Sequence, residues 1–535
     1  MAEGGQAGHE DGVRSYLEAF APVVDWDDLV RWPPDVFALA NLALDHTKSY
    51  RFAIAPPAGR FWPPFPEWNE EVSAAAQAWR TVSGGDGGAL PPLVRRSWES
   101  VTGLRDLPLA EIRSGAAWKL ICALHTLHAA ADEACAHLGS GAAAAAGSFE
   151  QRAWDLFRAH SSLARLSPRR MRVVPKTNFS PRGITIRSLS RYLGLSYELV
   201  PVQWTSGAPE GHARSQYNVL LLPWPLRVQA EDFRALPSTR LRNMDTERFG
   251  FFEFAPPATL DCGLVGSLLA EAAAAGSDVD AVVLPEAALL PEEIPALEET
   301  LARHAVRYVI SGVRQSQAYP VPGRNYLHLG MRTATGWERV EQSKHHRWSL
   351  DGPQIRQYHL SRTLDPQKLW WEAIDIGERT LGVAAVAPGV TVAPLVCEDL
   401  ASLDECAHLL RDMGPSLIVA VLLDGPQLTA RWPCRYSGVL ADDPGSAVLT
   451  LTSYGMAARC RPSGKRRSRV VAHWNSRTDR PHELSLGRGS AGVLLTLRVE
   501  PSTVWTADGR LHPNSPSMRL SSVQQLAGRR TRAPA

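Results

Sequence analysis

Three strand-like segments of the sequence each end in a residue type that can take part in nucleophilic catalysis. Glu286 follows the run VDAVVLP, Lys344 follows RVEQS, and Cys397 follows VTVAPLV. Side chains at the carboxyl ends of buried strands meet at one edge of a sheet, where such folds usually place their sites. We therefore expect these three side chains to lie together.

A thiol, a carboxylate and an ammonium group in one place suit covalent catalysis by cysteine. A thiol of ordinary pKa is mostly protonated at neutral pH, so Glu286 is the candidate base and Lys344 the candidate cation. Once sulfur attacks a carbonyl or nitrile carbon, Lys344 and the backbone N–H of Glu398 are candidates to stabilise the developing charge. Singly, these side chains are typical of packed core, solvated surface or a helix start, but their joint occurrence favours catalysis.

Four further residues are candidates for contact with a substrate. His345 and His346 follow the lysine, and because adjacent side chains on a strand point to opposite faces, we expect only one of them, His345, to face the pocket. Arg431 and Arg435 could bind a carboxylate or phosphate with a guanidinium fork. The alternative for both arginines is a salt bridge at the surface or an interface.

The elements around these residues divide the chain into four parts. Residues 1–165 carry helical apolar spacing and predict a helical N-terminal domain, whose clearest helix is expected over Ile112–Leu138 with Gly139 as its stop. Residues 166–210 predict a basic α/β connector. Residues 211–500 alternate strand-like and helical segments, which indicates a layered α/β domain. Residues 501–535 are polar and are expected to be a C-terminal arm or disordered.

Length, charge and cysteine use exclude several classes of protein. A chain of 535 residues predicts two or three domains, and a net charge of +2 predicts no polyanion as a general partner. The seven cysteines form no CxxC pair, which favours a reducing compartment. The polar N-terminus is unlike a signal peptide, and no apolar run reaches the roughly 20 residues of a membrane helix. We expect a cytoplasmic protein that does not bind membranes.

The motifs LPE, an isolated Lys and a strand-borne Cys, in that order, resemble the nitrilase (carbon–nitrogen hydrolase) superfamily. The likeness covers residues 215–500: YNVLLLPWP is similar to the first strand, and YVISGVR with GRNYL to a strand that leads to an asparagine. CED resembles the glutaminase domain of glutamine-dependent NAD synthetases. The resemblance implies a four-layer αββα sandwich, a homo-oligomer, and thioester chemistry at Cys397 that needs no metal or organic cofactor.

The same resemblance implies a second glutamate between the lysine and the cysteine. The segment soon after Lys344 offers Asp351 and Gln354 but no glutamate. Glu372 precedes Cys397 by 25 residues, a spacing similar to that of the omega-amidase-like branch, so we prefer it to Glu378.

A narrower likeness concerns the blocks QSKHHRW, LVCEDLA, DGPQLTARW and LADDPGSAVLTLTSYG. These resemble nitrilase domains attached to bacterial defence-associated reverse transcriptases. The chain has no Tyr-x-Asp-Asp polymerase signature, so the likeness implies a separate effector or partner in antiviral defence.

Two functions follow as hypotheses. The first is a cysteine-dependent hydrolase of a small amide, nitrile or carbamoyl compound. The alternative is a nitrilase-fold binding or assembly module without turnover, which recruits a protein partner or nucleic acid through the arginines of residues 165–191. A possible metal-binding helix face, with His125, His128, Asp132 and Cys135, is interpreted as packing because one helix seldom supplies a whole site.

Overall fold

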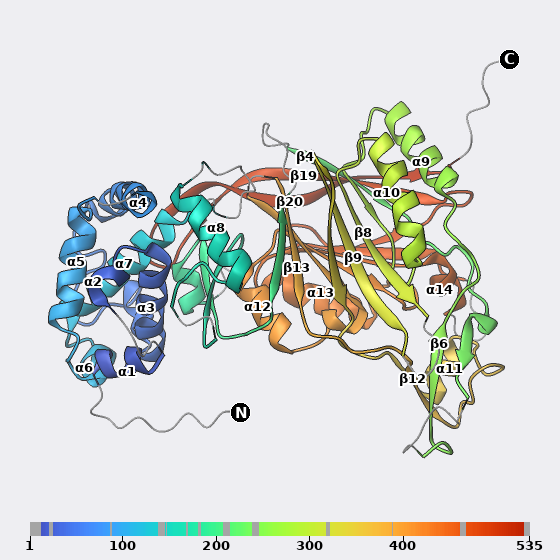
Figure 1. Cartoon of the computed structure of the whole chain (residues 1–535), viewed down its shortest axis with the longest axis horizontal. Helices are drawn as coiled ribbons and strands as arrows, with labels where there is room; N and C mark the ends of the chain where they lie inside the picture. The colour runs from blue at the N-terminus through green and yellow to red at the C-terminus, as the bar shows by residue number, and fades with distance from the viewer. Residues whose placement is uncertain are drawn as a thin grey trace.

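The computed structural model, shown in Figure 1, places a helical domain beside a larger sheet-rich domain. It describes residues 12–20, 25–85, 88–136, 138, 145, 147–166, 169–179, 183–206, 215–237, 245–316, 322–387, 389–460 and 467–528. Within these residues, no helix is both long enough and apolar enough to cross a membrane.

The N-terminal domain is built around α7 (Trp118–Ala134), whose residues are almost all buried because α3, α4 and α5 pack around it. The large side chains Phe37, Trp68 and Trp79 fill the space between these helices and have no exposed surface. The other helices are α1 (Val13–Phe20), α2 (Trp26–Leu29), α3 (Pro33–His46), α4 (Trp68–Gly84), α5 (Pro92–Gly103), α6 (Leu109–Ser114) and α8 (Phe149–His160). The helical character expected for this part of the chain is confirmed.

The single helix predicted over Ile112–Leu138 is wrong at both ends. Gly115 adopts a left-handed backbone, with φ of 84°, and this turn separates α6 from α7. The apolar spacing continued across the break because both helices bury a face in one core. Gly139, the expected stop signal, lies outside the described residues.

Two seven-stranded sheets form the larger domain. Sheet I has the order β10 (Gly336–Ser343), β9 (Arg324–Thr333), β8 (Tyr308–Gln315), β7 (Ala281–Val283), β4 (Gln216–Leu221), β19 (Gly492–Trp505) and β20 (Leu511–Leu526). Sheet II has the order β18 (His482–Ser485), β17 (Val470–Asn475), β16 (Ala447–Thr452), β15 (Leu417–Leu422), β14 (Val390–Val396), β13 (Leu381–Ala387) and β3 (Val202–Ser206).

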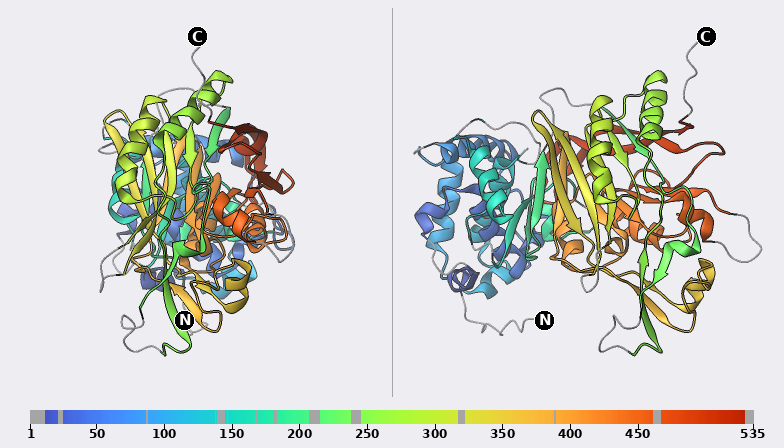
Figure 2. Two further views of the ribbon diagram at one scale, coloured as in Figure 1. Left: turned by 90° about the vertical axis from the view of Figure 1, so that its right-hand side faces the viewer. Right: turned by 45° about the vertical axis from the view of Figure 1, so that its right-hand side comes forward.

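The sheets pack face to face between outer helices, as the views of Figure 2 show. Leu221 and Val283 of sheet I share a buried core with Val392 and Leu395 of sheet II. Residues one position away on the same strands point to the opposite face, so Leu220 packs under the outer helices α9 (Cys262–Ala274) and α10 (Ile294–Arg303). On the far side α13 (Trp432–Asp442) covers β16 and β17. The expected α/β sandwich behind a helical domain is confirmed.

The connector region supplies a separate pair of strands and one edge strand of sheet II. β1 (Arg172–Pro175) and β2 (Leu193–Ser196) form a separate antiparallel pair, against which α12 (Glu405–Met413) packs. β3 pairs in parallel with β13 at the edge of sheet II, although it lies within the residues expected to be a connector.

The disordered alternative for the tail is wrong for residues 501–528. Strands β19 and β20 form a long hairpin at the edge of sheet I, and its far end reaches α7 and the loop before α4. There Arg510 contacts Asp132 at 3.0 Å, and the Trp62 indole donates to the Asp508 carbonyl at 2.9 Å. The polar composition of this segment reflects the exposed side chains of the hairpin. The two strands pair through backbone hydrogen bonds, which amino-acid composition does not indicate. Residues 529–535 lie outside the described part.

A third, four-stranded sheet lies beside the sandwich. Its order is β11 (Ser349–Leu350), β12 (Leu369–Glu372), β6 (Phe249–Phe254) and β5 (Phe233–Ala235). A small core of Phe233, Phe252 and Trp348 joins it to α11 (Gly352–Gln357) and α14 (Tyr454–Arg459). Strand β12 of this sheet ends at Glu372, whose carboxylate contacts Lys344 of the sandwich.

Candidate active site

Three sheets contribute to the candidate site. Glu286 follows β7 of sheet I, Lys344 follows β10 of the same sheet, and Cys397 follows β14 of sheet II. Glu372 is the last residue of β12. All four side chains are buried, with exposed fractions of 4% or less, so they face one another at the end of the sandwich and not the solvent.

Lys344 lies between the two glutamates. Its Nζ donates to Glu286 Oε1 at 2.7 Å and to Glu372 Oε2 at 2.6 Å. Asn325 on β9 connects the same carboxylates from another direction, because its Nδ2 donates to Glu286 Oε1 at 2.8 Å and to Glu372 Oε1 at 2.7 Å. One cation and one amide therefore hold the two carboxylates in place. Glu378, the alternative for the second glutamate, is exposed.

The Cys397 thiol lies beside the Glu286 carboxylate and the backbone N–H of Leu423. The same N–H contacts Glu286 Oε2 at 2.7 Å. Cys397 has φ of 48° and Ala287, directly after Glu286, has φ of 53°. Backbone in this left-handed region costs on the order of 1 kcal/mol or more for residues other than glycine, so tertiary contacts must hold both turns.

Burial and charge set the protonation of the cluster. Burial raises the pKa of the Cys397 thiol well above its ordinary value, and the Glu286 charge adds to this, while Lys344 opposes it. Burial also raises the pKa of Glu286, again against the effect of Lys344. For Lys344 burial alone would lower the pKa, but Glu286 and Glu372 outweigh it and raise the pKa well above its ordinary value. Burial and these charges therefore favour a neutral Cys397 thiol and a charged Lys344 ammonium group.

The turn formed by Glu286 and Ala287 packs against Gly312 of β8, and this position requires a glycine. A Cβ on Gly312 would overlap the Cα of Glu286 and would lie 2.5 Å from the Ala287 nitrogen. The Gly312 N–H donates to the Pro285 carbonyl at 3.0 Å, so the turn rests directly on this strand. The close approach positions the carboxylate.

A cleft of about 420 Å³ lies next to the cluster, a volume within the usual range for small-molecule sites. Glu398 and His345, the residues that directly follow Cys397 and Lys344, line it with His346, and Phe251 and Trp371 form an apolar wall. Burial raises the pKa of Glu398.

The expectation that only one of the two histidines faces the pocket is wrong. Both His345 and His346 line the cleft, because they lie in a bend after β10 and not on a strand, so side chains do not alternate there. His346 Nδ1 lies 2.9 Å from Asp399 Oδ1, and Asp399 Oδ2 accepts Arg379 Nη1 at 2.8 Å. The pair with Asp399 fixes the His346 ring beside the cleft.

The two arginines singled out from the sequence lie on or just before α13. Arg431 pairs with Asp424 at 2.6 Å, and Asp424 also accepts the Tyr358 hydroxyl. Arg431 thus makes an ion pair within the protein, whereas the alternative had been a salt bridge at the surface or an interface. Arg435 is exposed on α13 and is not part of the buried cluster.

Two contributors to the site were not selected from the sequence. Asn325 lies in the GRNYL motif but was not chosen as a site residue, although the family resemblance already indicated an asparagine at this position. Leu423 contributes only its backbone N–H, so its side-chain type carries no signal at all.

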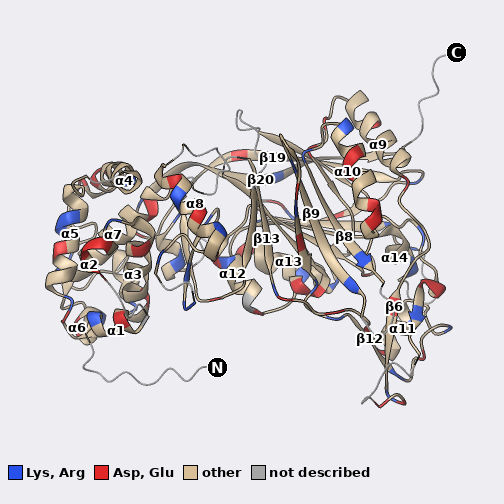
Figure 3. Cartoon of the chain, viewed as in Figure 1, with Lys and Arg blue, Asp and Glu red and all other residues tan. Residues whose placement is uncertain are grey.

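Several arginines of residues 165–191 are bound within the protein. Arg165 pairs with Asp35 at 2.8 Å, and Arg187 with Asp443 at 2.8 Å. In Figure 3, acidic and basic residues are interspersed over the N-terminal helices. Arg182 lies outside the described residues. A partner that binds through this segment stays a prediction.

The helix face with possible metal ligands makes other contacts. Asp132 accepts the backbone N–H groups of Arg191, Tyr192 and Leu193, besides its contact with Arg510. His128 Nε2 lies 3.2 Å from Asn41 Nδ2. Among the described residues, no three His, Cys, Asp or Glu side chains are grouped so as to hold a metal ion.

Comparison with known proteins gave structural matches only. No family model matches the sequence, and no curated protein does. Solved structures that match include members of the nitrilase (CN-hydrolase) superfamily. XC1258 from Xanthomonas campestris, a CN-hydrolase superfamily protein with an arsenic adduct in its active site, is 16% identical over 44% of this chain and 76% of its own, with a TM-score of 0.27.

Two others are Nit3 from Saccharomyces cerevisiae, a branch 10 member of the nitrilase superfamily, and the NitFhit protein of C. elegans. Nit3 is 11% identical over 58% of this chain and 90% of its own, with a TM-score of 0.28. NitFhit is 9% identical over 50% of this chain and 57% of its own, with a TM-score of 0.32.

Proposed function

We propose that the chain is a nitrilase-superfamily enzyme that hydrolyses a non-peptide carbon–nitrogen bond with Cys397 as nucleophile. The observation that carries this proposal is the buried cluster in which Lys344 bridges Glu286 and Glu372 while the Cys397 thiol contacts Glu286. Each group has the chemistry and the neighbour that its role requires.

In the first half of the reaction, Glu286 takes the thiol proton as sulfur attacks the amide or nitrile carbon. The raised pKa of Glu286 brings it closer to that of the thiol, which makes this transfer easier. The C–S bond forms as charge moves onto oxygen or nitrogen. Lys344 and the backbone N–H of Glu398, at the start of the short helical turn Cys397–Leu400, are the donors for that charge. An amide then loses its amine, which receives the proton held by Glu286.

In the second half, water attacks the thioester carbon and gives up a proton to a carboxylate. The C–S bond breaks, the acid product leaves, and the proton returns to the sulfur. Glu372 accepts a second hydrogen bond from Lys344, besides the one to Glu286, so its role is to keep the ammonium group in place through both halves. A nitrile would require an additional water to reach the same thioester. The mechanism uses no metal or cofactor.

The decisive experiment is mass spectrometry of the intact protein during incubation with a panel of small amides, nitriles and carbamoyl compounds. The expected result is an acyl adduct that maps to Cys397, with release of ammonia or an amine. Cys397→Ala is expected to lose both. Cys262→Ala is the matched control, since Cys262 lies on the outer helix α9, away from the cluster. Turnover that survives in Cys397→Ala would refute the proposal.

Three finer points belong to this proposal and rest on the sequence resemblance. They are preference for an amide-like substrate, self-association into a homo-oligomer, and a role in bacterial antiviral defence. Each stays a prediction.

A further inference from the structure

A second, smaller cavity lies away from the candidate active site, where three parts of the chain meet. It has a volume of about 50 Å³, and its walls come from the connector after β1, from the ends of strands in sheet II, and from the β19–β20 hairpin. A cavity needs only about 10–15 Å³ to hold one water molecule, whereas drug-sized ligands need several hundred. Its size therefore suits a small ion or one functional group of a larger molecule.

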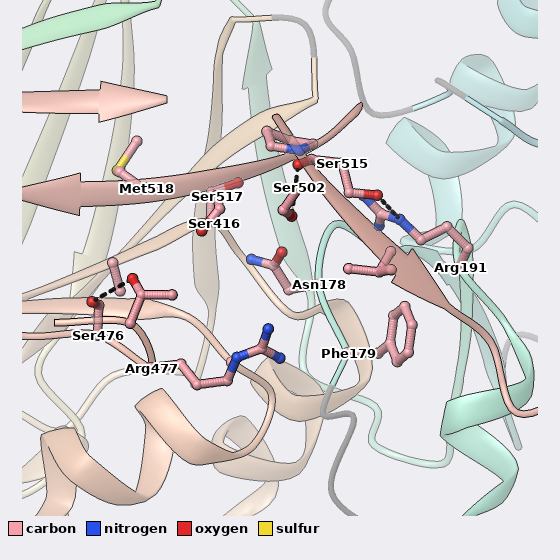
Figure 4. A pocket seen from close by; sticks show the side chains of 15 residues that line it. Asn178, Phe179, Arg191, Ser416, Ser476, Arg477, Ser502, Ser515, Ser517 and Met518 are labelled. Carbon is pink, nitrogen blue, oxygen red and sulfur yellow. Dashed lines mark hydrogen bonds between the residues drawn. The ribbon is translucent and has the colours of Figure 1, made fainter. Parts of the chain in front are cut away.

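The charged residues that line this cavity are both cationic. Arg191 and Arg477 contribute guanidinium groups, and Figure 4 shows them on two sides of Asn178. None of the described residues that line the cavity is an aspartate or a glutamate. Most of the remaining polar groups are hydroxyls, among them those of Ser502 and Ser517. The described lining of the cavity thus provides positive charge and hydrogen-bonding groups.

Arg191 is the more informative of the two cations, because it is 94% buried, with an exposed fraction of 6%. Its Nε donates to the Ser515 hydroxyl at 3.3 Å and its Nη1 to the Thr177 carbonyl, both neutral oxygens. The nearby carboxylates Asp132 and Glu133 instead contact the Arg510 guanidinium at 3.0 and 2.7 Å. Within the described part of the chain, no carboxylate lies within salt-bridge distance of Arg191 or Arg477.

A buried cation without a direct counter-ion is costly, and the usual compensation is an anion. We propose that this cavity binds a small tetrahedral oxyanion, either inorganic phosphate or the phosphoryl end of a phosphomonoester. Two guanidinium groups facing one space match several oxygens of a phosphate at once, and the hydroxyls serve as additional donors.

Binding there would act on the joint between the two domains. The Arg191 backbone N–H donates to Asp132 of α7 at 2.7 Å, while its side chain contacts Ser515 of the hairpin. Arg477 belongs to the loop between β17 and β18 of sheet II. An anion shared by both arginines therefore connects the helical domain, the hairpin and sheet II, and the bound form is expected to resist unfolding of this joint.

The test uses the full chain and measures the thermal unfolding midpoint against inorganic phosphate, with sodium chloride at matched ionic strength. The midpoint is expected to rise with phosphate and to change much less with chloride. In Arg477→Gln, phosphate affinity from isothermal titration calorimetry should fall by at least about tenfold, since a charge-assisted contact is worth about 1.5–3 kcal/mol. Arg477 is exposed, so this variant should fold.

Arg480→Gln is the matched control, because Arg480 is an exposed arginine on the same loop that does not line the cavity. It should bind phosphate as the wild type does. If a phosphomonoester competes with phosphate, the cavity admits the phosphoryl end of a larger molecule. If it does not compete, the ligand is the free phosphate ion. Equal phosphate affinity in wild type, Arg477→Gln and Arg480→Gln, or equal shifts with chloride, would overturn the proposal.

Discussion

Lys344 Nζ donates a 2.6 Å hydrogen bond to Glu372 Oε2, in a place where the lysine has no exposed surface and the glutamate almost none. The two residues come from different sheets, so this contact ties the small four-stranded sheet to sheet I at the candidate site. An ion pair this deeply buried is costly unless further hydrogen bonds support it, and Asn325 and Glu286 supply them.

Glu372→Gln is expected to leave the fold intact and to slow turnover by about 10–100-fold, since a charge-assisted hydrogen bond is worth about 1.5–3 kcal/mol. The physical reason is that the amide keeps the shape of the carboxylate but no longer balances the charge of Lys344. Rapid-quench kinetics with intact-mass detection of the acyl-enzyme would measure the effect on each half of the reaction. Glu378→Gln, a change at an exposed glutamate six residues along the chain, is the control. Equal rates in the two variants would exclude a role for Glu372.

Gly312→Ala is expected to lower activity strongly and to destabilise the protein by about 1–3 kcal/mol, the usual cost of overpacking. The added methyl group would overlap the Cα of Glu286, so the Glu286 turn must shift away from Cys397. Gly266→Ala on α9 is the control, because its new Cβ would meet its nearest neighbour, His304, at an ordinary 3.5 Å. Denaturant unfolding and turnover would be measured together. Full activity in Gly312→Ala would mean that the turn tolerates displacement.

The sequence allowed prediction of those site residues whose side chains have a chemical role. Glu286, Lys344 and Cys397 could be selected because each type, after a strand, has a recognisable use. The Leu423 N–H could not, because a backbone group is the same in every residue type, and only the fold brings it to Glu286 and Cys397.

The errors in the predicted fold have a common physical cause. Patterns of apolar and polar residues indicate which side chains are buried, but they do not determine the backbone geometry. Strand alternation failed at His345 and His346 because the chain bends after β10. The polar tail was expected to be an arm or disordered, yet β20 pairs along its length with β19, through backbone hydrogen bonds that do not depend on composition. The helical period similarly continued across the left-handed turn at Gly115.

His346 and His345 should affect the pH dependence of stability in opposite directions. The hydrogen bond to Asp399 raises the pKa of His346 despite partial burial, so its contribution is complete below the ordinary histidine pKa and is lost as pH rises through the folded value. Burial, followed by the nearby Arg379 charge, lowers the pKa of His345, so its neutral form is favoured and stability is lost as pH falls below the ordinary value. The measurement is the denaturant midpoint at about pH 5.5 and about pH 8, on either side of the ordinary histidine pKa.

In that measurement, His346→Gln should lose more stability relative to wild type at the lower pH than at the higher. His345→Gln, its neighbour on the same cleft wall, should instead gain relative stability at the lower pH, and so serves as the matched control. If stability depended on pH in the same way in both variants as in wild type, the prediction that the two histidines have oppositely shifted pKa values would be wrong.

Arg510→Met should separate the helical domain from the sandwich. The buried Arg510 guanidinium contacts Asp132 and Asp508 at 3.0 Å each, and its removal leaves uncompensated carboxylates, at a cost of about 3–5 kcal/mol. Because the hairpin end and α7 lose their shared cation, the helical domain should unfold first, giving two calorimetric transitions and earlier proteolysis within α7. Arg519→Met on β20 of the same hairpin is the control, since Arg519 is exposed and pairs with Asp479 and Glu500 rather than with the helical domain. A single transition at the wild-type midpoint in Arg510→Met would show that other contacts, such as that of Trp62 with Asp508, are sufficient to hold the hairpin against the helices.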